Sequence, residues 1–135
     1  ESFYEFLQEV DHPACRAAFD AWTPALQGED LAAVARKLAP LTVHTTVADY
    51  VRLPRYRYRN ELVNFDRQPD YVLAVPIGEG VIDYKAFLNA LREGGFDGFV
   101  AYEMCSPVRG GGSLENLDRC ARKFLQFMQP FLTRQ

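Results

Sequence analysis

The fold of this chain is decided by one stretch of its sequence, Phe99-Val-Ala-Tyr-Glu-Met-Cys-Ser-Pro-Val-Arg-Gly-Gly-Gly112. The apolar start of the stretch, residues 99–102, predicts a buried strand, and Glu103 follows that strand directly. Three glycines then precede an amphipathic pattern that predicts a helix over about 114–128. Because the loops after parallel strands converge at one edge of an α/β sheet, we expect Glu103 to belong to a functional site.

Composition and charge are those of an ordinary globular domain. The sequence has 135 residues, of which 48% are hydrophobic and 24% charged, enough for a single domain with a modest core. A formal net charge of -3 argues against nucleic acid as a partner. No apolar run is long enough to cross a membrane. The three widely spaced cysteines suit free thiols in a reducing, cytoplasmic setting.

Helix-like and strand-like segments alternate along the chain. The patterns predict helices at 2–10, 30–38, 83–94 and 114–128, and strands at 14–19, 41–47 and 99–102. Residues 23–28 are predicted to be a loop, and so are residues 48–76, which form a connection long enough to be a lid or a binding loop. The alternation predicts an α/β fold of parallel β/α units, although three strands are few for a well-buried parallel sheet.

Two further polar residues accompany the predicted strands, as Glu103 does. Asp20 follows the first strand, and His44 lies inside the second or near its end. Two carboxylates and an imidazole at one edge of a sheet suit a divalent metal such as Mn²⁺, Mg²⁺, Fe²⁺ or Zn²⁺. Each residue also has a simpler interpretation, Asp20 as a helix or turn cap and His44 as a hydrogen-bonded buried histidine.

Several motifs occur in an order that resembles a known family. They are Phe19-Asp-Ala-Trp, Val43-His-Thr-Thr-Val-Ala-Asp, Val75-Pro-Ile-Gly-Glu-Gly-Val-Ile-Asp-Tyr, Gly94-Gly-Phe-Asp-Gly-Phe and Tyr102-Glu. Together they resemble the C-terminal part of the sugar phosphate isomerase/epimerase superfamily, the xylose-isomerase-like TIM barrels. The resemblance implies that residues 1–135 are a single partial TIM-barrel domain, about strands six to eight of eight, and that the N-terminal portion lies outside this sequence.

The resemblance also implies a metal site and a mechanism. It places one divalent ion, Mn²⁺ first and Mg²⁺, Co²⁺ or Zn²⁺ as alternatives, on Asp20, His44 and Glu103, with a further glutamate ligand before residue 1. Glu103 would also be one of two glutamates that move a proton next to the polarised carbonyl, so this portion alone is expected to be inactive. The sequence departs from the family at Thr23 and Thr46, where many members have a histidine and a lysine.

Three other side chains are candidates for substrate contacts. Arg109, beside the three glycines, suits an anion or phosphate site, or else a flexible turn with a solvated arginine. The run of arginines and tyrosines from Tyr50 to Arg59 suits a lid or a subunit interface rather than RNA, and Arg52 is its preferred substrate contact. Trp22 is a candidate to stack on a sugar face, or else a tryptophan of the core or of an interface.

These observations favour a divalent-metal-dependent isomerase or epimerase acting on a small sugar or sugar phosphate. The alternatives are a dehydratase or lyase acting on an inosose or keto-sugar with the same metal site, and a non-catalytic α/β module that binds a partner through the arginine–tyrosine run. We expect no nucleic-acid or membrane partner, and a homo-oligomer is one option. The strand that ends near Asp20 is expected to expose an edge that favours association.

Overall fold

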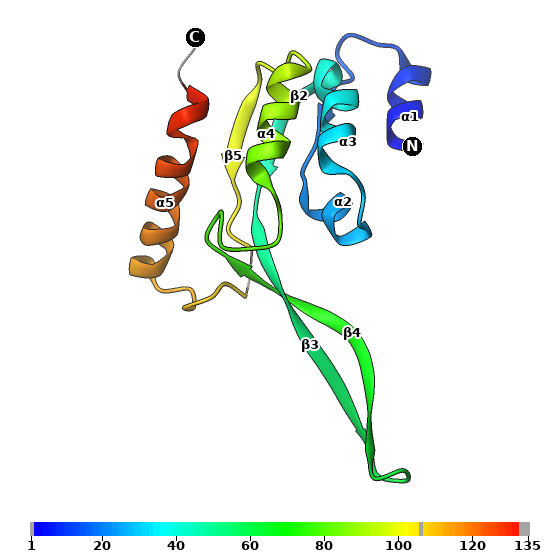
Figure 1. Ribbon diagram of the computed structural model, residues 1–135. Coiled ribbons are helices and arrows are strands. Elements are labelled where there is room, and N and C mark those ends of the chain that lie inside the picture. Colours follow the sequence, from blue (N-terminus) through cyan, green and yellow to red (C-terminus); the bar gives the residue numbers. More distant parts are fainter. Residues whose placement is uncertain (1, 106, 133–135) are drawn as a thin grey trace.

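The computed structural model describes residues 2–105 and 107–132, which form a three-stranded parallel sheet, surrounding helices and a long β-hairpin (Figure 1). The sheet has the order β1-β2-β5, with β1 at Ala17–Ala18, β2 at Thr42–Val47 and β5 at Phe99–Tyr102. All pairings within it are parallel. This confirms the predicted α/β fold of parallel β/α units, the arrangement of the C-terminal part of a TIM barrel.

The predicted helices are present, and a short helix and a 3₁₀ turn are added to them. The helical segments are α1 (Ser2–Val10), α2 (Trp22–Gln27), α3 (Leu31–Leu38), the 3₁₀ turn η1 (Ala39–Leu41), α4 (Tyr84–Glu93) and α5 (Leu114–Leu132). The loop predicted at 23–28 is wrong, because α2 occupies it. Pro24 lies in the first turn of α2, where a missing N–H costs little. Gly28 ends this helix with a φ of 77°, in the left-handed region.

The first strand is shorter than predicted and lies at the edge of the sheet. Only Ala17 and Ala18 of the predicted 14–19 strand pair with β2, and the register shifts between them. Upstream, the N–H of Cys15 donates to the carbonyl of His12 in a turn, which delays the start of the strand. Within the described residues no other strand pairs with β1, so the expected open edge is confirmed.

The long segment after β2 is a β-hairpin rather than a loop. Its strands, β3 (Asp49–Arg59) and β4 (Asn64–Val75), pair in antiparallel fashion over nearly their whole length. The hairpin leaves the carboxyl end of the sheet and extends away from the helices (Figure 1). The prediction of a loop was wrong. Arginine and tyrosine alternate over residues 55–59, a period of two that fits a strand, but both kinds of side chain are exposed here, so the alternation does not mark a buried face.

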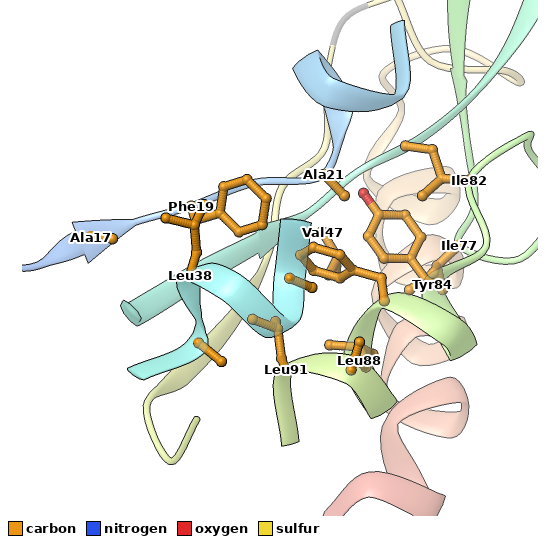
Figure 2. Close-up of a cluster of buried hydrophobic side chains, with 14 of the residues drawn as sticks. Ala17, Phe19, Ala21, Leu38, Val47, Ile77, Ile82, Tyr84, Leu88 and Leu91 are labelled. Carbon is orange, nitrogen blue, oxygen red and sulfur yellow. The ribbon is translucent and has the colours of Figure 1, made fainter. Parts of the chain in front are cut away.

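The hydrophobic core lies between the sheet and helices α3 and α4 (Figure 2). Phe87 of α4 is fully buried, with its ring 5.6 Å from that of Phe19 and 5.9 Å from that of Tyr84. At the β5 edge of the sheet, Phe124 of α5 stacks on Tyr102 of β5 with 4.9 Å between ring centroids. These contacts attach the helices to the strands and so fix the positions of the strand ends. No helix in the described ranges has the length and apolarity that a membrane crossing needs.

Candidate functional site

A cavity of about 220 Å³ lies at the carboxyl ends of the three parallel strands. Its lining mixes carboxylates, hydroxyls, a thiol and an aromatic face: Asp20, Trp22, Thr23, Thr46, Ala48, Tyr84, Glu103 and Cys105. We call this cavity the rim pocket. Its position agrees with the general rule that sites in parallel α/β proteins form where the strands end.

Asp20 reaches the rim pocket while it also caps α2. Its Oδ1 accepts hydrogen bonds from the N–H of Trp22 at 2.8 Å and, more weakly, from the N–H of Thr23 at 3.4 Å. The carboxylate therefore holds the first turn of α2 against the end of β1. The simpler expectation for Asp20, a cap, is confirmed, and its place in the pocket lining keeps it as a candidate site residue.

Glu103 stands at the edge of the same pocket from the opposite strand. Its N–H donates to the carbonyl of Val47 at 3.0 Å, which continues the β2–β5 pairing one residue beyond Tyr102. The exposed side chain begins where the strand ends. The thiol of Cys105 lies close enough to both carboxylates for their charges to affect it. Burial raises its pKa, and the negative charges of Glu103 and Asp20 raise it further. The two predicted carboxylates therefore share one pocket.

His44 does not join them, which corrects the expected three-residue metal set. His44 is the third residue of β2 and pairs with Ala18 and with Phe99, the first residue of β5. At about 3.3 Å per residue, it lies roughly 10 Å before the end of β2 at Val47. The β2 residue in the pocket lining is Thr46. In the described part of the chain, no three or more His, Cys, Asp or Glu side chains are grouped as a metal site requires.

Of the three predicted substrate-contact residues, one lines the rim pocket and two lie outside its lining. Trp22 lines the rim pocket and packs on Tyr50, with 4.5 Å between ring centroids. Arg52 lies outside the pocket lining, and its Nη2 faces the carbonyls of Ala25 and Leu26 at 3.4 and 3.5 Å, near the end of α2. A cation is favourable there because of the helix dipole.

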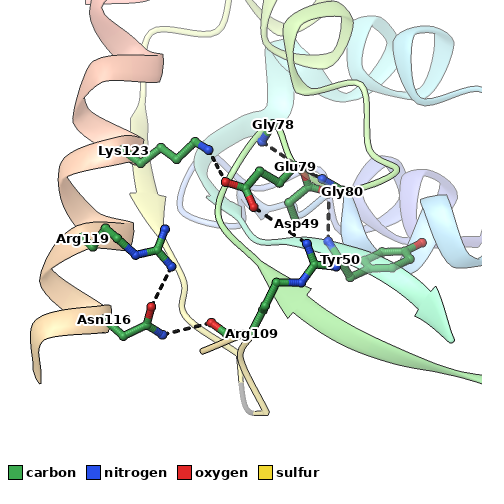
Figure 3. Close-up of polar contacts among 9 residues, drawn as sticks. All are labelled: Asp49, Tyr50, Gly78, Glu79, Gly80, Arg109, Asn116, Arg119 and Lys123. Carbon is green, nitrogen blue, oxygen red and sulfur yellow. Dashed lines mark hydrogen bonds and ion pairs between the residues drawn. The ribbon is translucent and has the colours of Figure 1, made fainter. Parts of the chain in front are cut away.

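Arg109 also lies outside the pocket lining and belongs to an ordered loop (Figure 3). Its Nη1 is 3.9 Å from Oε2 of Glu79, and the other carboxylate oxygen, Oε1, accepts a hydrogen bond from Lys123. The side-chain amide of Asn116 donates to the carbonyls of Arg109 and Gly111 at 3.0 and 2.6 Å. These bonds argue against a flexible turn, and a phosphate site at Arg109 stays a prediction.

Two residues that sequence reasoning missed support the pocket from behind. Asp49, 1% exposed, accepts hydrogen bonds from the N–H groups of Tyr50, Gly78, Gly80 and Ile82. It thereby ties the base of the hairpin to the segment before α4 (Figure 3). A side chain at position 80 would collide with this carboxylate, because an added Cβ would lie 2.0 Å from Oδ1 of Asp49. The sequence signal was an acid after a strand, followed later by a glycine-rich turn.

Tyr84 is the second supporting residue. Its hydroxyl donates to the carbonyl of Ala48 at 2.8 Å and accepts from the N–H of Ala48 at 2.9 Å. Burial raises the pKa of this phenol well above its usual range, so it stays protonated. Tyr84 therefore holds in place the backbone that leads from β2 into the hairpin.

Comparison with known proteins agrees with this geometry. Residues 1–128 match the family model described as the xylose isomerase-like TIM barrel. A comparison with curated proteins finds no match. The match covers nearly all of the chain, and it agrees with the parallel β/α units and with the resemblance to sugar phosphate isomerases and epimerases. The chain therefore belongs to the xylose isomerase-like TIM barrel family, most of whose members are enzymes.

Proposed function

We propose that this chain supplies one side of the active site of a sugar or sugar phosphate isomerase or epimerase. The observation that carries the proposal is the meeting of Asp20 and Glu103 in one pocket at the carboxyl ends of parallel strands. In a family of mostly enzymes, that is the place where catalytic groups are expected. The reaction is a proton transfer at a carbon next to a carbonyl group.

Glu103 is the proposed acid–base group of this reaction. A carboxylate that removes a proton from carbon and returns it must reach the substrate directly. Glu103 meets that need because its side chain is exposed and lines the pocket. Asp20 is held by its bonds to α2, so we assign it a positioning role toward substrate hydroxyls. The ring of Trp22 provides a face on which a sugar could stack.

The described residues do not by themselves fit a divalent metal. Two carboxylates line the pocket, but the β2 residue in the lining is Thr46 rather than a histidine. His44 lies nearer the start of β2, away from the pocket. A metal held by Asp20 and Glu103 would need further donors from outside the described residues, since carboxylate-bound ions take more ligands than two. The acid–base proposal for Glu103 therefore stands on the carboxylate alone.

The test follows hydrogen exchange at carbon in the full-length protein that contains this chain. Aldoses, ketoses and their phosphates are incubated in D₂O and examined by NMR and mass spectrometry. An isomerase or epimerase yields a product with deuterium at the reacting carbon and no other change in composition, whereas a dehydratase yields a product lighter by one water. A loss of water would replace the proposed function with the dehydratase alternative.

Paired variants assign the residue. Glu103→Gln removes the ionisable group with little change in shape, and we expect it to abolish deuterium incorporation. Glu115→Gln makes the same chemical change on an exposed residue in the first turn of α5 and should leave incorporation unchanged. Full turnover in Glu103→Gln would remove this residue from the mechanism. No exchange with any carbohydrate would favour the non-catalytic alternative.

A further inference from the structure

The distal part of the β3–β4 hairpin, residues 52–71, projects from the chain as an arm (Figure 1). We call these residues the arm. Strands β3 and β4 pack extensively on each other and make at most sparse contacts with any other element of the described chain. The contacts of Arg52 with the end of α2 lie at the very base of the arm. Beyond that base, nothing in the described residues covers either face.

Such an arm is poorly stabilised on its own. A two-stranded hairpin is marginal in water unless it packs against something else, yet β3 has 11 residues and β4 has 12. The arm's internal ion pairs, Arg59–Glu61 at 2.7 Å, Arg59–Asp66 at 3.2 Å and Arg67–Asp70 at 2.9 Å, are partly to largely exposed. Exposed pairs contribute about 0–1 kcal/mol each. The length of the arm therefore points to a surface that covers it.

The arm presents the side chains that protein interfaces use. Directly opposite residues in an antiparallel pair share a face, and the register sets Tyr56 opposite Arg67 and Tyr58 opposite Phe65. All four side chains are exposed, and the rings of Tyr58 and Phe65 lie 5.1 Å apart. Exposed tyrosine, phenylalanine and arginine side chains in one patch are typical of interface centres.

The tip of the arm is apolar as well. Leu62 is 66% exposed and Val63 is 79% exposed. Val63 has a φ of 49°, a left-handed conformation that β-branched residues avoid. The turn thus holds an aliphatic side chain outward in a strained conformation, although a polar residue or glycine would suit the turn better.

Charge indicates what covers the arm. The arm, residues 52–71, contains five arginines and three acidic residues, whereas the rest of the sequence contains ten basic and fifteen acidic residues. The arm is therefore positive and the remainder of the chain negative. A second arm would repel the first, and a nucleic acid attracted by the arm would be repelled by the remainder. The negative remainder of another copy matches the arm in charge.

We propose that the arm packs against the acidic part of a second copy of this chain and so forms a homodimer. Each copy has one positive arm and a remainder with a net negative charge, so the contact can form twice about a two-fold axis and close the assembly. The apolar tip and the Tyr58–Phe65 pair supply buried area, and the arginines supply orientation and rate of association. This inference is independent of the proposed chemistry, since it uses none of the residues of the rim pocket.

The first experiment measures the mass of the full chain in solution by sedimentation velocity, over a range of concentrations and at low salt. A variant in which Asn-Gly replaces residues 54–70 keeps the paired residues Leu53 and Tyr71 joined by a two-residue turn. We expect a dimer for the unchanged chain and a monomer for the shortened variant, with an unchanged helical circular dichroism spectrum. A monomeric unchanged chain, or a shortened variant that still dimerises, would overturn the proposal.

The second experiment reverses one charge and leaves the fold alone. Arg57→Glu reverses the charge of an exposed side chain of the arm, and Lys85→Glu reverses the charge of an exposed side chain on α4. We expect Arg57→Glu to raise the dimer dissociation constant about tenfold at low salt, with a smaller effect at high salt where charges are screened. Lys85→Glu should not weaken the dimer. Equal weakening by both variants, or capture of an RNA oligonucleotide by a chain that stays monomeric, would contradict the proposal.

Discussion

Replacing the buried carboxylate of Asp49 by an amide tests the structural basis of the rim pocket. Oδ1 of Asp49 accepts from the N–H groups of Tyr50 and Ile82 at 2.9 and 3.3 Å. Oδ2 accepts from those of Gly78 and Gly80 at 3.0 and 2.9 Å. In Asp49→Asn one of the two oxygens becomes an NH₂ group. Whichever oxygen is lost, two backbone N–H groups lose their acceptor and face another donor.

The expected cost follows from that count. A buried donor left without an acceptor costs about 1–3 kcal/mol, so two of them lower the free energy of unfolding by roughly 2–6 kcal/mol. That is a large share of the 5–15 kcal/mol, roughly, that stabilises a typical domain. We therefore expect Asp49→Asn to be strongly destabilised, with the base of the hairpin and the segment before α4 loosened first.

The assay is urea unfolding followed by circular dichroism, with Asp83→Asn as the matched control. Asp83 is an exposed N-cap whose carboxylate accepts a single hydrogen bond, from the N–H of Ala86 at 2.9 Å. Asparagine caps helices about as well as aspartate, so this control should change stability by less than about 0.5 kcal/mol. If the two variants unfold at the same urea concentration, the proposed role of the Asp49 network is refuted.

Three further predictions concern single groups. Thr45 is buried, and its hydroxyl has no hydrogen-bond partner within the described residues. Thr45→Val should therefore raise the free energy of unfolding by about 0.5–1 kcal/mol in urea titrations, and a loss of stability would contradict this. The hydrogen bond from Lys123 is the main cause that holds the pKa of Glu79 below the ordinary value for a glutamate. Its stabilisation is therefore present at pH values above that ordinary pKa and lost as the pH falls, and Glu79→Gln should flatten the acid side of the stability curve. Burial and then the charge of Glu103 raise the pKa of Cys105, so Glu103→Gln should speed alkylation of this thiol by iodoacetamide at pH 8, as followed by mass spectrometry. An unchanged rate would show that the charge of Glu103 does not act on Cys105.

The helices were largely predictable because their signals are local. Asp30 and Asp83 each precede an apolar periodic segment, and their carboxylates accept N-cap hydrogen bonds from the N–H groups of Ala33 at 3.0 Å and Ala86 at 2.9 Å. Helix α2 escaped prediction because Pro24 and Gly28 are as typical of a loop as of a short helix, and because Asp20 has two interpretations, a strand-end ligand and a cap. Both features are compatible with a short helix, and the pocket geometry is needed to decide.

The candidate site, too, was predictable in part. Sequence alone placed Asp20 and Glu103 directly after strands, and the parallel sheet brings such positions to one edge, so their shared pocket follows from the order of elements along the chain. The prediction that His44 is a metal ligand did not hold, because its distance from the end of β2 depends on the pairing of β2 with β5. In the observed register Val47 pairs with Tyr102, so His44 pairs with Phe99 at the start of β5 and lies away from the pocket.

What the sequence determined by itself is the set of β/α units, their order and the family, because caps, periodicity and turn residues act over a few residues. What only the tertiary structure decided is which strand position reaches the pocket, that Asp49 is a buried anchor, and that residues 49–75 are a hairpin. Each of these depends on hydrogen bonds between residues far apart in the chain. The energy of such bonds depends on strand register and burial, which neighbouring residues do not specify.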